Sequence, residues 1–344
     1  MSLVVDSLSA EVGDGRERKR VLHDVSLRIE TGTLGAVLGP SGSGKSTLLR
    51  CIAGLHGTVS GAIRSGSRDL RGLPPERRRV GLVPQDGALF PHLTVGENVA
   101  FGLSKHIRRS RRVDDLLELV ELPGLASRYP HELSGGQAQR VALARALAPS
   151  PEVVLLDEPF SALDATLRAA VREQVRRALA ETGTTAILVT HDQTEALSIA
   201  DRLIVLSDGR VRQIGSPQEV YQRPVDLWTG QFVGEAVVLP GRGEGSRVTT
   251  AIGDLRLVDP AVGAVTVLLR PEQVRIVEGP GTPARVVSVD YFGHDALVDL
   301  DLVADPGIRI SARLAAPVSL REGDAVQIRV ADPVLAFVAP RQDP

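Results

Sequence analysis

The chain has 344 residues, a formal net charge of −2 and a single cysteine, Cys51. This length is too great for one typical hydrophobic core, so two domains are expected. The nearly balanced charge argues against general affinity for nucleic acids. One cysteine excludes an intrachain disulfide, a Cys-rich zinc site and a cysteine-held iron–sulfur cluster, and we interpret Cys51 as a small buried residue.

No targeting or membrane-spanning segment is expected. Residues 1–6 show no basic region followed by a long apolar one, which is the pattern of a signal peptide. No run of about 18 apolar residues occurs, so nothing is predicted to span a membrane. The sequence therefore predicts a soluble cytoplasmic protein whose role at any membrane would depend on a partner.

The first 53 residues predict strands followed by a helix. Residues 1–33 alternate apolar and polar side chains, which is typical of antiparallel strands. Residues 13–20 are mostly charged and are predicted to form a solvated hairpin tip. Residues 34–38 are an apolar run of strand character, and residues 46–53 have helical spacing without a breaker.

A glycine-rich loop joins that strand to that helix. It fits the pattern Gly, four residues, Gly-Lys-Ser, which is typical of the phosphate-binding loop of nucleoside triphosphatases. Glycines let backbone amides wrap a triphosphate, and the helix N-terminus adds free N–H groups and a partial positive charge. An ordinary glycine- and serine-rich turn would not need the Lys-Ser pair. The predicted nucleotide contacts are Gly39, Pro40, Ser41, Gly42, Ser43, Gly44, Lys45, Ser46 and Thr47.

The character of the chain changes over residues 86–150. Thr94 followed by Glu97 has the spacing of a helix capping box, and residues 114–120 are amphipathic with acids in the first turn. This block is predicted to be a helical insertion. Just before it, the arginines at positions 77, 78 and 79 are interpreted first as a solvated face.

Two continuous apolar runs follow, at residues 153–156 and 186–189, as expected of parallel strands covered on both faces. Helical segments separate them, which predicts an α/β sheet. Pro224 and residues 234–245 are interpreted as the end of this half of the chain, with breakers at Pro240, Gly241, Gly243 and Gly245.

The rest of the chain predicts short strands between Gly, Pro and Asp turns, at residues 265–269, 284–289, 296–300, 308–313 and 325–330. This spacing favours a small all-β, OB-like barrel. The predicted domains are residues 1–235, with a helical subdomain at about residues 86–150, and residues 236–344.

Acidic and imidazole side chains follow the two apolar strands. Carboxylates at the carboxyl end of a parallel strand face the same crevice as the phosphate loop. Asp157 is therefore predicted to hold Mg²⁺ together with the Ser46 hydroxyl, and Glu158 to orient or deprotonate the attacking water. His191 is predicted to contact the γ-phosphate or help to place that water. Two exposed acids and a locally satisfied histidine are the alternatives.

A second predicted anion site lies within the helical insertion. Ser134 is a helix cap, Gly135 and Gly136 give access to the backbone, and a strong helix follows Gln137. The helix after the phosphate loop already occupies one side of the triphosphate. This second helix end therefore favours a dimer in which each site is closed by the Ser134 loop of the other copy.

Taken in order, these motifs resemble those of the ATP-binding subunit of an ABC transporter. Residues 39–47 resemble its Walker A motif, residues 153–158 its Walker B motif with a catalytic glutamate, and residues 133–137 its signature. The resemblance covers residues 1 to about 235. As a set the motifs are far more specific than any one of them.

Single residues extend the resemblance. Gln85 resembles the Q-loop residue that senses Mg²⁺ and the transmembrane subunit, and His191 resembles the switch histidine. The segment from Ser161 to Asp164 resembles the D-loop. The resemblance implies a P-loop ABC ATPase domain with ATP and Mg²⁺ as cofactors. The implied residues are Glu158, His191 and Lys45 for catalysis, Gln85, Ser134, Gly135, Gly136, Gln137 and Asp164 for the nucleotide, and Ser46, Gln85 and Asp157 for the metal ion.

The expected adenine contact departs from the family pattern. The family usually stacks adenine on an aromatic residue upstream of Walker A, but Val12 stands at that place and residues 1–40 contain no Phe, Tyr or Trp. We expect adenine to meet an aliphatic surface or the partner chain. Relaxed discrimination between ATP and GTP is a hypothesis.

The C-terminal part resembles the regulatory barrel of importer ATPases for iron(III), sulfate, polyamines, quaternary amines, molybdate and sugars. The likeness rests on Leu-Leu-Arg-Pro-Glu at residues 268–272 and on residues 289–298, which look nearest the iron(III) importers. It implies a head-to-tail homodimer at the cytoplasmic face of the cell membrane. The implied partners are transmembrane permease subunits and, indirectly, an extracytoplasmic solute-binding protein, with no nucleic acid.

Other functions stay open at this point. The importer could serve another solute, such as a quaternary amine, a polyamine, sulfate or a sugar. A soluble ABC ATPase acting on DNA or ribosomes is disfavoured, because no long coiled-coil insertion and only one Lys45-type loop are seen. A nucleotide-dependent regulator whose barrel binds a ligand is the third alternative.

Overall fold

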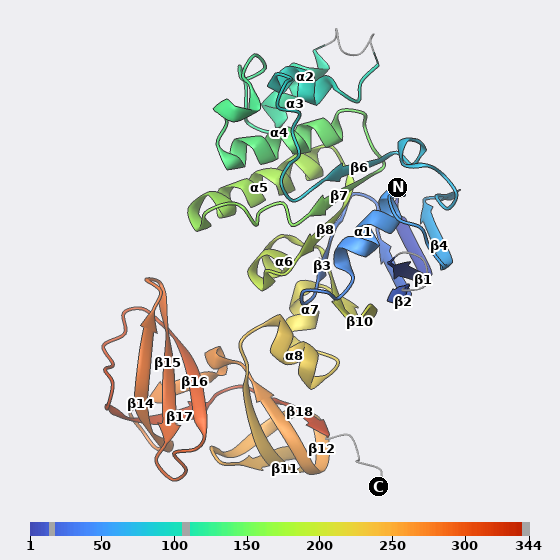
Figure 1. Cartoon of the computed structure of the whole chain (residues 1–344). Coiled ribbons are helices and arrows are strands. Elements are labelled where there is room, and N and C mark those ends of the chain that lie inside the picture. Colours follow the sequence, from blue (N-terminus) through green and yellow to red (C-terminus); the bar gives the residue numbers. More distant parts are fainter. Residues whose placement is uncertain (14–17, 105–110, 339–344) are drawn as a thin grey trace. The chain divides into compact units, whose positions relative to one another are not determined.

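The computed structural model describes residues 1–13, 18–104 and 111–338 (Figure 1). The chain divides into two compact units, Met1–Val220 and Tyr221–Pro344. Within the described ranges, no helix combines the length and apolar character that crossing a membrane requires.

A six-stranded sheet forms the centre of the first unit, in the order β10-β9-β3-β8-β7-β6. Its strands are β3 (Leu34–Leu38), β6 (Val80–Val83), β7 (Val153–Asp157), β8 (Thr185–Thr190), β9 (Arg202–Ser207) and β10 (Arg210–Gly215). All neighbours are parallel except β10, which pairs antiparallel with β9. Every residue of β3 and β8 is buried, which explains their continuous apolar sequence. The predicted α/β sheet is confirmed.

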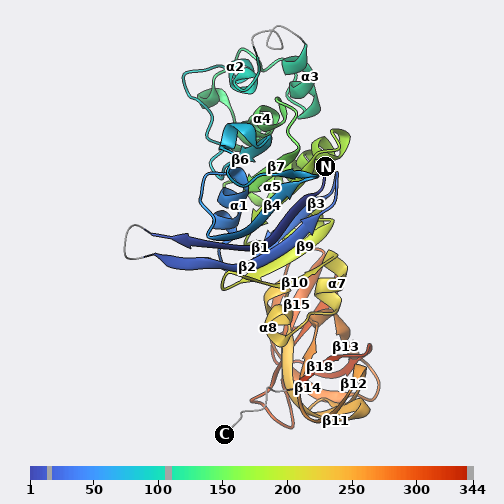
Figure 2. The same cartoon turned by 90° about the vertical axis from the view of Figure 1, so that its right-hand side faces the viewer.

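A second, antiparallel sheet has the order β2-β1-β4-β5. It consists of β1 (Leu3–Val12), β2 (Lys19–Ile29), β4 (Ser60–Ser65) and β5 (Arg68–Asp69). Figure 2 shows β1 and β2 side by side as a long hairpin. The antiparallel strands expected near the N-terminus are therefore confirmed, whereas the predicted hairpin tip falls partly on residues 14–17, outside the described residues. Helix α1 (Lys45–Ala53) contributes Leu48, Leu49 and Ile52 to a core that both sheets share.

Most helices of the first unit lie between the phosphate loop and the last strands of the central sheet. They are α2 (Val95–Ala100), α3 (Arg112–Leu119), α4 (Gly135–Leu147), α5 (Ala165–Glu181) and α6 (Gln193–Ile199), with short 3₁₀ turns at Pro75–Arg77 and Pro130–Glu132, and α7 (Pro217–Gln222) reaches the division between the units. Thr94 and Glu97 form the expected capping box at the start of α2. Figure 1 shows α2, α3 and α4 grouped together, in agreement with the predicted helical insertion.

Arg78 corrects the interpretation of the arginine run as a solvated face. Its side chain is buried, and its guanidinium donates to the carbonyl oxygens of Cys51 (2.7 Å), Ile52 (2.9 Å) and Leu73 (2.9 Å). The last carbonyls of a helix have no partner within the helix, so Arg78 supplies the donors that the end of α1 needs. Arg77 and Arg79 are exposed, as expected. Burial also raises the pKa of the Cys51 thiol to about 11, so the thiol is an inert core residue.

Arg78→Ala should lower the free energy of unfolding by about 2–4 kcal/mol, because it leaves buried carbonyls without donors. Chemical denaturation of the full chain measures this loss. Arg77→Ala is the matched control and should change stability by about 0.5 kcal/mol or less, as for most exposed positions. Equal effects of the two substitutions would contradict the capping role.

The first complete element of the second unit is α8 (Leu227–Val233), and strands make up most of the rest. Three strands form one sheet, β11 (Val237–Thr250), β12 (Gly253–Leu269) and β18 (Leu335–Val338), and five form another, β13 (Val274–Val277), β14 (Thr282–Tyr291), β15 (Asp295–Leu302), β16 (Arg309–Ala315) and β17 (Ala325–Val330). A 3₁₀ turn, Pro271–Gln273, links β12 to β13. The five predicted strands are all present, and the all-β character is confirmed.

Four of the residues interpreted as breakers, Pro240, Gly241, Gly243 and Gly245, lie inside β11 and do not interrupt it. β11 is an edge strand, where a proline such as Pro240 does not interrupt a ladder. A Cβ at Gly241 would lie 2.7 Å from Val248 Cγ2, and one at Gly243 would lie 2.6 Å from the Ala261 carbonyl oxygen. These glycines permit close approach within the β11–β12 hairpin.

A buried arginine explains why the second unit begins before residue 236, where the sequence placed the start of the barrel. Arg270 Nη1 donates to the carbonyl oxygens of Gly230 (2.8 Å), Gly234 (3.0 Å) and Glu235 (2.9 Å), and Nη2 donates to that of Tyr221 (3.1 Å). Burial lowers the pKa of Arg270. The segment from Tyr221 to Glu235 is thereby tied to the strands that follow it.

Candidate functional site

The phosphate loop runs from the end of β3 into α1. Gly42 and Gly44 have φ values of +79° and +101°, which only glycine adopts without strain, and a Cβ at Gly39 would clash with the Leu206 carbonyl oxygen. Lys45 is buried, and its Nζ donates to the carbonyl oxygens of Gly39 (2.8 Å) and Pro40 (3.0 Å). Burial lowers the Lys45 pKa, and the carboxylates of Glu158 and Asp157 oppose that shift. Backbone groups of the loop therefore surround the Lys45 ammonium.

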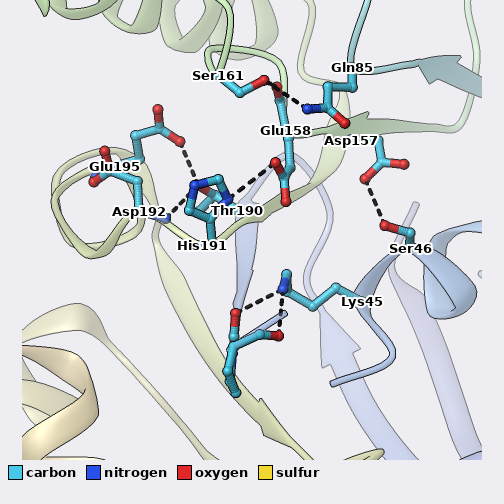
Figure 3. Close-up of polar contacts among 12 residues, drawn as sticks. Lys45, Ser46, Gln85, Asp157, Glu158, Ser161, Thr190, His191, Asp192 and Glu195 are labelled. Carbon is cyan, nitrogen blue, oxygen red and sulfur yellow. Dashed lines mark hydrogen bonds and ion pairs between the residues drawn. The ribbon is translucent and has the colours of Figure 1, made fainter. Parts of the chain in front are cut away.

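Asp157 and Ser46 meet across the edge of the central sheet. Ser46 Oγ, in the first turn of α1, donates to Asp157 Oδ1 at the end of β7 (3.3 Å) (Figure 3). Burial raises the pKa of Asp157, the hydrogen bond from Ser46 opposes the shift, and the Glu158 carboxylate adds to it. The structure thus brings together the two oxygen-bearing side chains predicted to share a metal ion.

Glu158 and His191 form a second pair at the same edge. His191 Nδ1 lies 3.1 Å from Glu158 Oε2, and the imidazole is the more exposed partner (Figure 3). The Glu158 backbone has a φ of +46°, and its N–H donates to the Val189 carbonyl oxygen on β8 (2.9 Å). A left-handed conformation at a residue other than glycine costs about 1–3 kcal/mol and is often found at functional sites.

A buried network supports the turn that carries His191. Thr190 Oγ1 donates to Glu195 Oε2 (2.6 Å), and the Asp192 N–H donates to Thr190 Oγ1 (3.0 Å). Asp192 also caps α6 through the Glu195 N–H (3.0 Å). Burial raises the pKa of Glu195. Sequence reasoning missed Thr190 and Glu195 as supports, although Asp192 followed by Glu195 has the spacing of a helix start.

Gln85 is within reach of the same cluster. Its Nε2 donates to Ser161 Oγ (3.3 Å), and Ser161 Oγ donates to the Glu158 carbonyl oxygen (2.9 Å) (Figure 3). Sequence reasoning placed Ser161 in the D-loop-like segment but gave it no role. Its spacing of three residues from Glu158, with a proline between them, is a turn signal that could have found it.

The residues of the predicted second anion site make contacts of their own. Ser134 Oγ accepts from the Gln137 N–H (3.3 Å), and Gln137 Oε1 accepts from the Ser134 N–H (2.9 Å), so the expected cap of α4 is present. Ser134 and Gly135 are exposed, whereas Gly136 is buried. Asp164 Oδ1 accepts from the Leu167 N–H (3.0 Å) at the start of α5.

A pocket of about 400 Å³ opens at the phosphate loop. Its described lining is Val12, Val21, Ser41, Gly42, Gly44, Lys45, Ser46, Thr47 and Glu158, and includes neither Ser134 nor Asp164. Val12, the expected base contact, lines this pocket, and so does Val21, which sequence reasoning did not name. Val12 lies on β1 and Val21 on β2, and these strands pair. The predicted pairing of the two strands could therefore have indicated that the two valines lie near each other. Relaxed discrimination between ATP and GTP stays a prediction.

Comparison with known proteins decides the family. A model of the ABC transporter family matches residues 22–161, and a TOBE domain model matches residues 267–337. The chain is 48% identical to Fe(3+) ions import ATP-binding protein FbpC 2 of Rhodococcus jostii (strain RHA1), over 98% of this chain and 99% of that protein. The chain belongs to the ABC transporter family. This ABC ATPase binds and hydrolyses ATP.

The chain is also similar to a second importer subunit and to a protein of known structure. The sulfate/thiosulfate import ATP-binding protein CysA of Rhodopseudomonas palustris (strain ATCC BAA-98 / CGA009) is 43% identical over 91% of this ABC ATPase and 96% of that protein. A dimeric, post-hydrolysis ATP-binding cassette bound to ADP and Pi is 33% identical, with a TM-score of 0.55. It covers 62% of this chain and 98% of its own.

Asp157→Asn should stabilise this ABC ATPase at pH 7 when nucleotide is absent and a chelator is present. A carboxyl whose pKa is raised on folding stabilises the fold below its ordinary value of 3.8 and loses that contribution as the pH rises through the folded value. The neutral amide avoids the half-buried charge and still accepts from Ser46. Thermal unfolding should show a higher Tm at pH 7 and no gain below about pH 4, where the native carboxyl is protonated too. A lower Tm at pH 7 would contradict the assignment.

Val12→Tyr should lower the KM for ATP by at least about 5-fold, because stacking of a base on an aromatic ring is worth about 1–3 kcal/mol. Steady-state ATPase assays measure the effect. Val12→Ala, which adds no ring, should leave the KM within about 2-fold of the natural protein. An unchanged KM in Val12→Tyr would place the base elsewhere.

Proposed function

We propose that this ABC ATPase is the ATP-hydrolysing subunit of an importer for iron(III). Support comes from relatives in Rhodococcus jostii (strain RHA1) named for Fe(3+) ion import, which are 48% and 46% identical over 98% of this chain, TOBE domain included. The sulfate/thiosulfate relative has a similar length and 43% identity, so another solute is the alternative. The observation that best supports ATP hydrolysis as the source of energy for import is the Glu158–His191 pair beside the phosphate loop.

The roles of the site residues follow from their chemistry. Lys45 and the loop amides bind the β- and γ-phosphates, for which a cation and free N–H groups are suited. Glu158 orients or deprotonates the attacking water, and His191 holds the Glu158 carboxylate and contacts the γ-phosphate. The donor set of Ser46, Asp157 and Gln85 consists of hydroxyl, carboxylate and amide oxygens, which fit Mg²⁺, and the ion would neutralise phosphate charge.

A second copy of the chain completes each site. Ser134 and Gly135 are exposed at the start of the 13-residue helix α4. They are absent from the described lining of the loop's own pocket. A head-to-tail dimer brings this helix end of one copy to the triphosphate bound by the other, with Asp164 nearby. The dimeric cassette bound to ADP and Pi supports such an assembly.

The remaining partners follow from the import function. Closure and reopening of the dimer are transmitted to permease subunits in the membrane through the helical insertion and Gln85. A solute-binding protein on the other side of the membrane delivers the solute and acts on this chain only indirectly. The protein would then work at the cytoplasmic face of the cell membrane, without nucleic acid.

Glu158→Gln should slow ATP hydrolysis by about 10²- to 10⁴-fold, the range for loss of a general base, and trap a closed dimer with ATP. Phosphate release and size-exclusion chromatography measure the two effects. Glu173→Gln, an exposed position on α5, is the matched control and should leave both unchanged. Near-normal hydrolysis in Glu158→Gln would remove Glu158 from the role.

Deleting the gene for this chain should abolish energy-dependent iron(III) uptake and leave sulfate uptake intact. Restoring the natural gene should restore uptake, whereas a Lys45→Ala gene should not. Loss of sulfate uptake alone would assign the other solute. Co-purification with a two-subunit membrane complex separates the importer from the soluble and regulatory alternatives.

A further inference from the structure

The backbone of Glu158 is held in an unusual conformation by its neighbours. Its φ of +46° belongs to the left-handed region, which a residue with a side chain occupies only when the surroundings enforce it. Val189 accepts from its N–H (2.9 Å). Ser161 holds the other side of the residue, because its Oγ (2.9 Å) and its N–H (3.2 Å) both donate to the Glu158 carbonyl oxygen. Any shift of Ser161 therefore alters the backbone from which the carboxylate projects.

The Ser161 hydroxyl is shared between two partners. It donates its single proton to the Glu158 carbonyl oxygen and accepts from Gln85 Nε2 (3.3 Å) (Figure 3). A hydroxyl has one donor and two acceptor sites, so these two contacts are compatible and polarise each other. Gln85 thus reaches the backbone of the catalytic glutamate through one oxygen atom.

Helix α4 also holds the turn that carries Gln85. Arg145, on α4, donates to the carbonyl oxygens of Ala88 (2.7 Å) and Gly87 (2.9 Å). Its guanidinium carbon also lies 5.4 Å from the centroid of the Phe90 ring, within the range of a cation–π contact. Gly87 and Ala88 both have positive φ values. The turn is therefore held against α4, the helix that Ser134 caps.

We propose that Ser161 is a positioning residue that makes the orientation of the Glu158 carboxylate depend on the position of Gln85. The proposal rests on the proposed catalytic role of Glu158. When the turn at Gln85 moves, the hydroxyl of Ser161 loses or gains one partner, and the Glu158 peptide relaxes or tightens with it. Ser161 touches neither nucleotide nor water in this role, so its effect falls on turnover rather than on ATP binding.

Substitutions of Ser161 in the full chain test the relay with ATP and Mg²⁺ present. Ser161→Ala should lower kcat by about 10- to 100-fold, the range for a misplaced catalytic group, and leave the KM for ATP within about 2-fold. Ser161→Thr keeps the hydroxyl at an exposed position and should restore kcat to within about 3-fold of the natural value.

Ser198→Ala is the matched control. Ser198 Oγ also donates to the carbonyl oxygen of the residue three positions earlier (3.3 Å), but on α6 and not to Glu158. Its kcat should equal that of the natural chain. An unchanged kcat in Ser161→Ala, or a Ser161→Thr variant as slow as Ser161→Ala, would overturn the proposal.

A double-mutant cycle tests the link to Gln85 itself. If Gln85 acts on Glu158 through Ser161 in addition to its metal contact, the fold-loss of kcat caused by Gln85→Ala should be at least about 3-fold smaller in the Ser161→Ala background than in the natural chain. Multiplicative effects of the two substitutions would overturn the relay. Glu158→Gln, measured in the same assay, distinguishes the proposed function from the relay. Normal hydrolysis in Glu158→Gln would contradict the proposed function. Loss of hydrolysis in Glu158→Gln together with multiplicative effects of the other two substitutions would contradict the relay alone.

Discussion

The alignment of three parallel strands at one edge of the central sheet is the constraint on which the site depends. Leu38 at the end of β3 pairs with Thr190 on β8, and Asp157 at the end of β7 pairs with Val189. This register brings the phosphate loop, the two acids and His191 within hydrogen-bond reach, although they are far apart in sequence. Because a one-residue slip turns every side chain to the other face, the buried apolar runs also specify the chemistry.

Buried polar groups with assigned partners keep that edge in place. Arg78 satisfies the carbonyls at the end of α1, the helix that starts in the phosphate loop. Thr190 and Glu195 fix the turn before His191. Each such group would destabilise the fold if its partner were removed, since burial without a hydrogen bond costs about 1–3 kcal/mol. The same burial raises the pKa of Asp157, so the fold holds a carboxylate ready for a cation at some expense to its own stability.

Much of the fold and most of the loop and edge residues could be predicted, because their signals are local. Each of these residues stands beside a glycine pattern or at the end of an apolar run, so its position at the sheet edge follows from its neighbours in sequence. They are Lys45, Ser46, Asp157, Glu158 and His191. The hidden features are contacts between segments distant in sequence. Arg78 looks like its exposed neighbours, and the glycines of β11 look like breakers until the strand facing them is known.

The sequence by itself determined that this chain binds a triphosphate, that a helical block interrupts an α/β sheet, and that strands follow. Periodicity and turn chemistry carry that information within a few residues of each position. Only the tertiary structure decided which arginine is buried, that Val21 joins Val12 at the pocket, and that Ser161 stands between Gln85 and Glu158. The physical reason is that hydrogen bonding and burial depend on which segments the sheet register and helix packing bring together, and no local pattern encodes that choice.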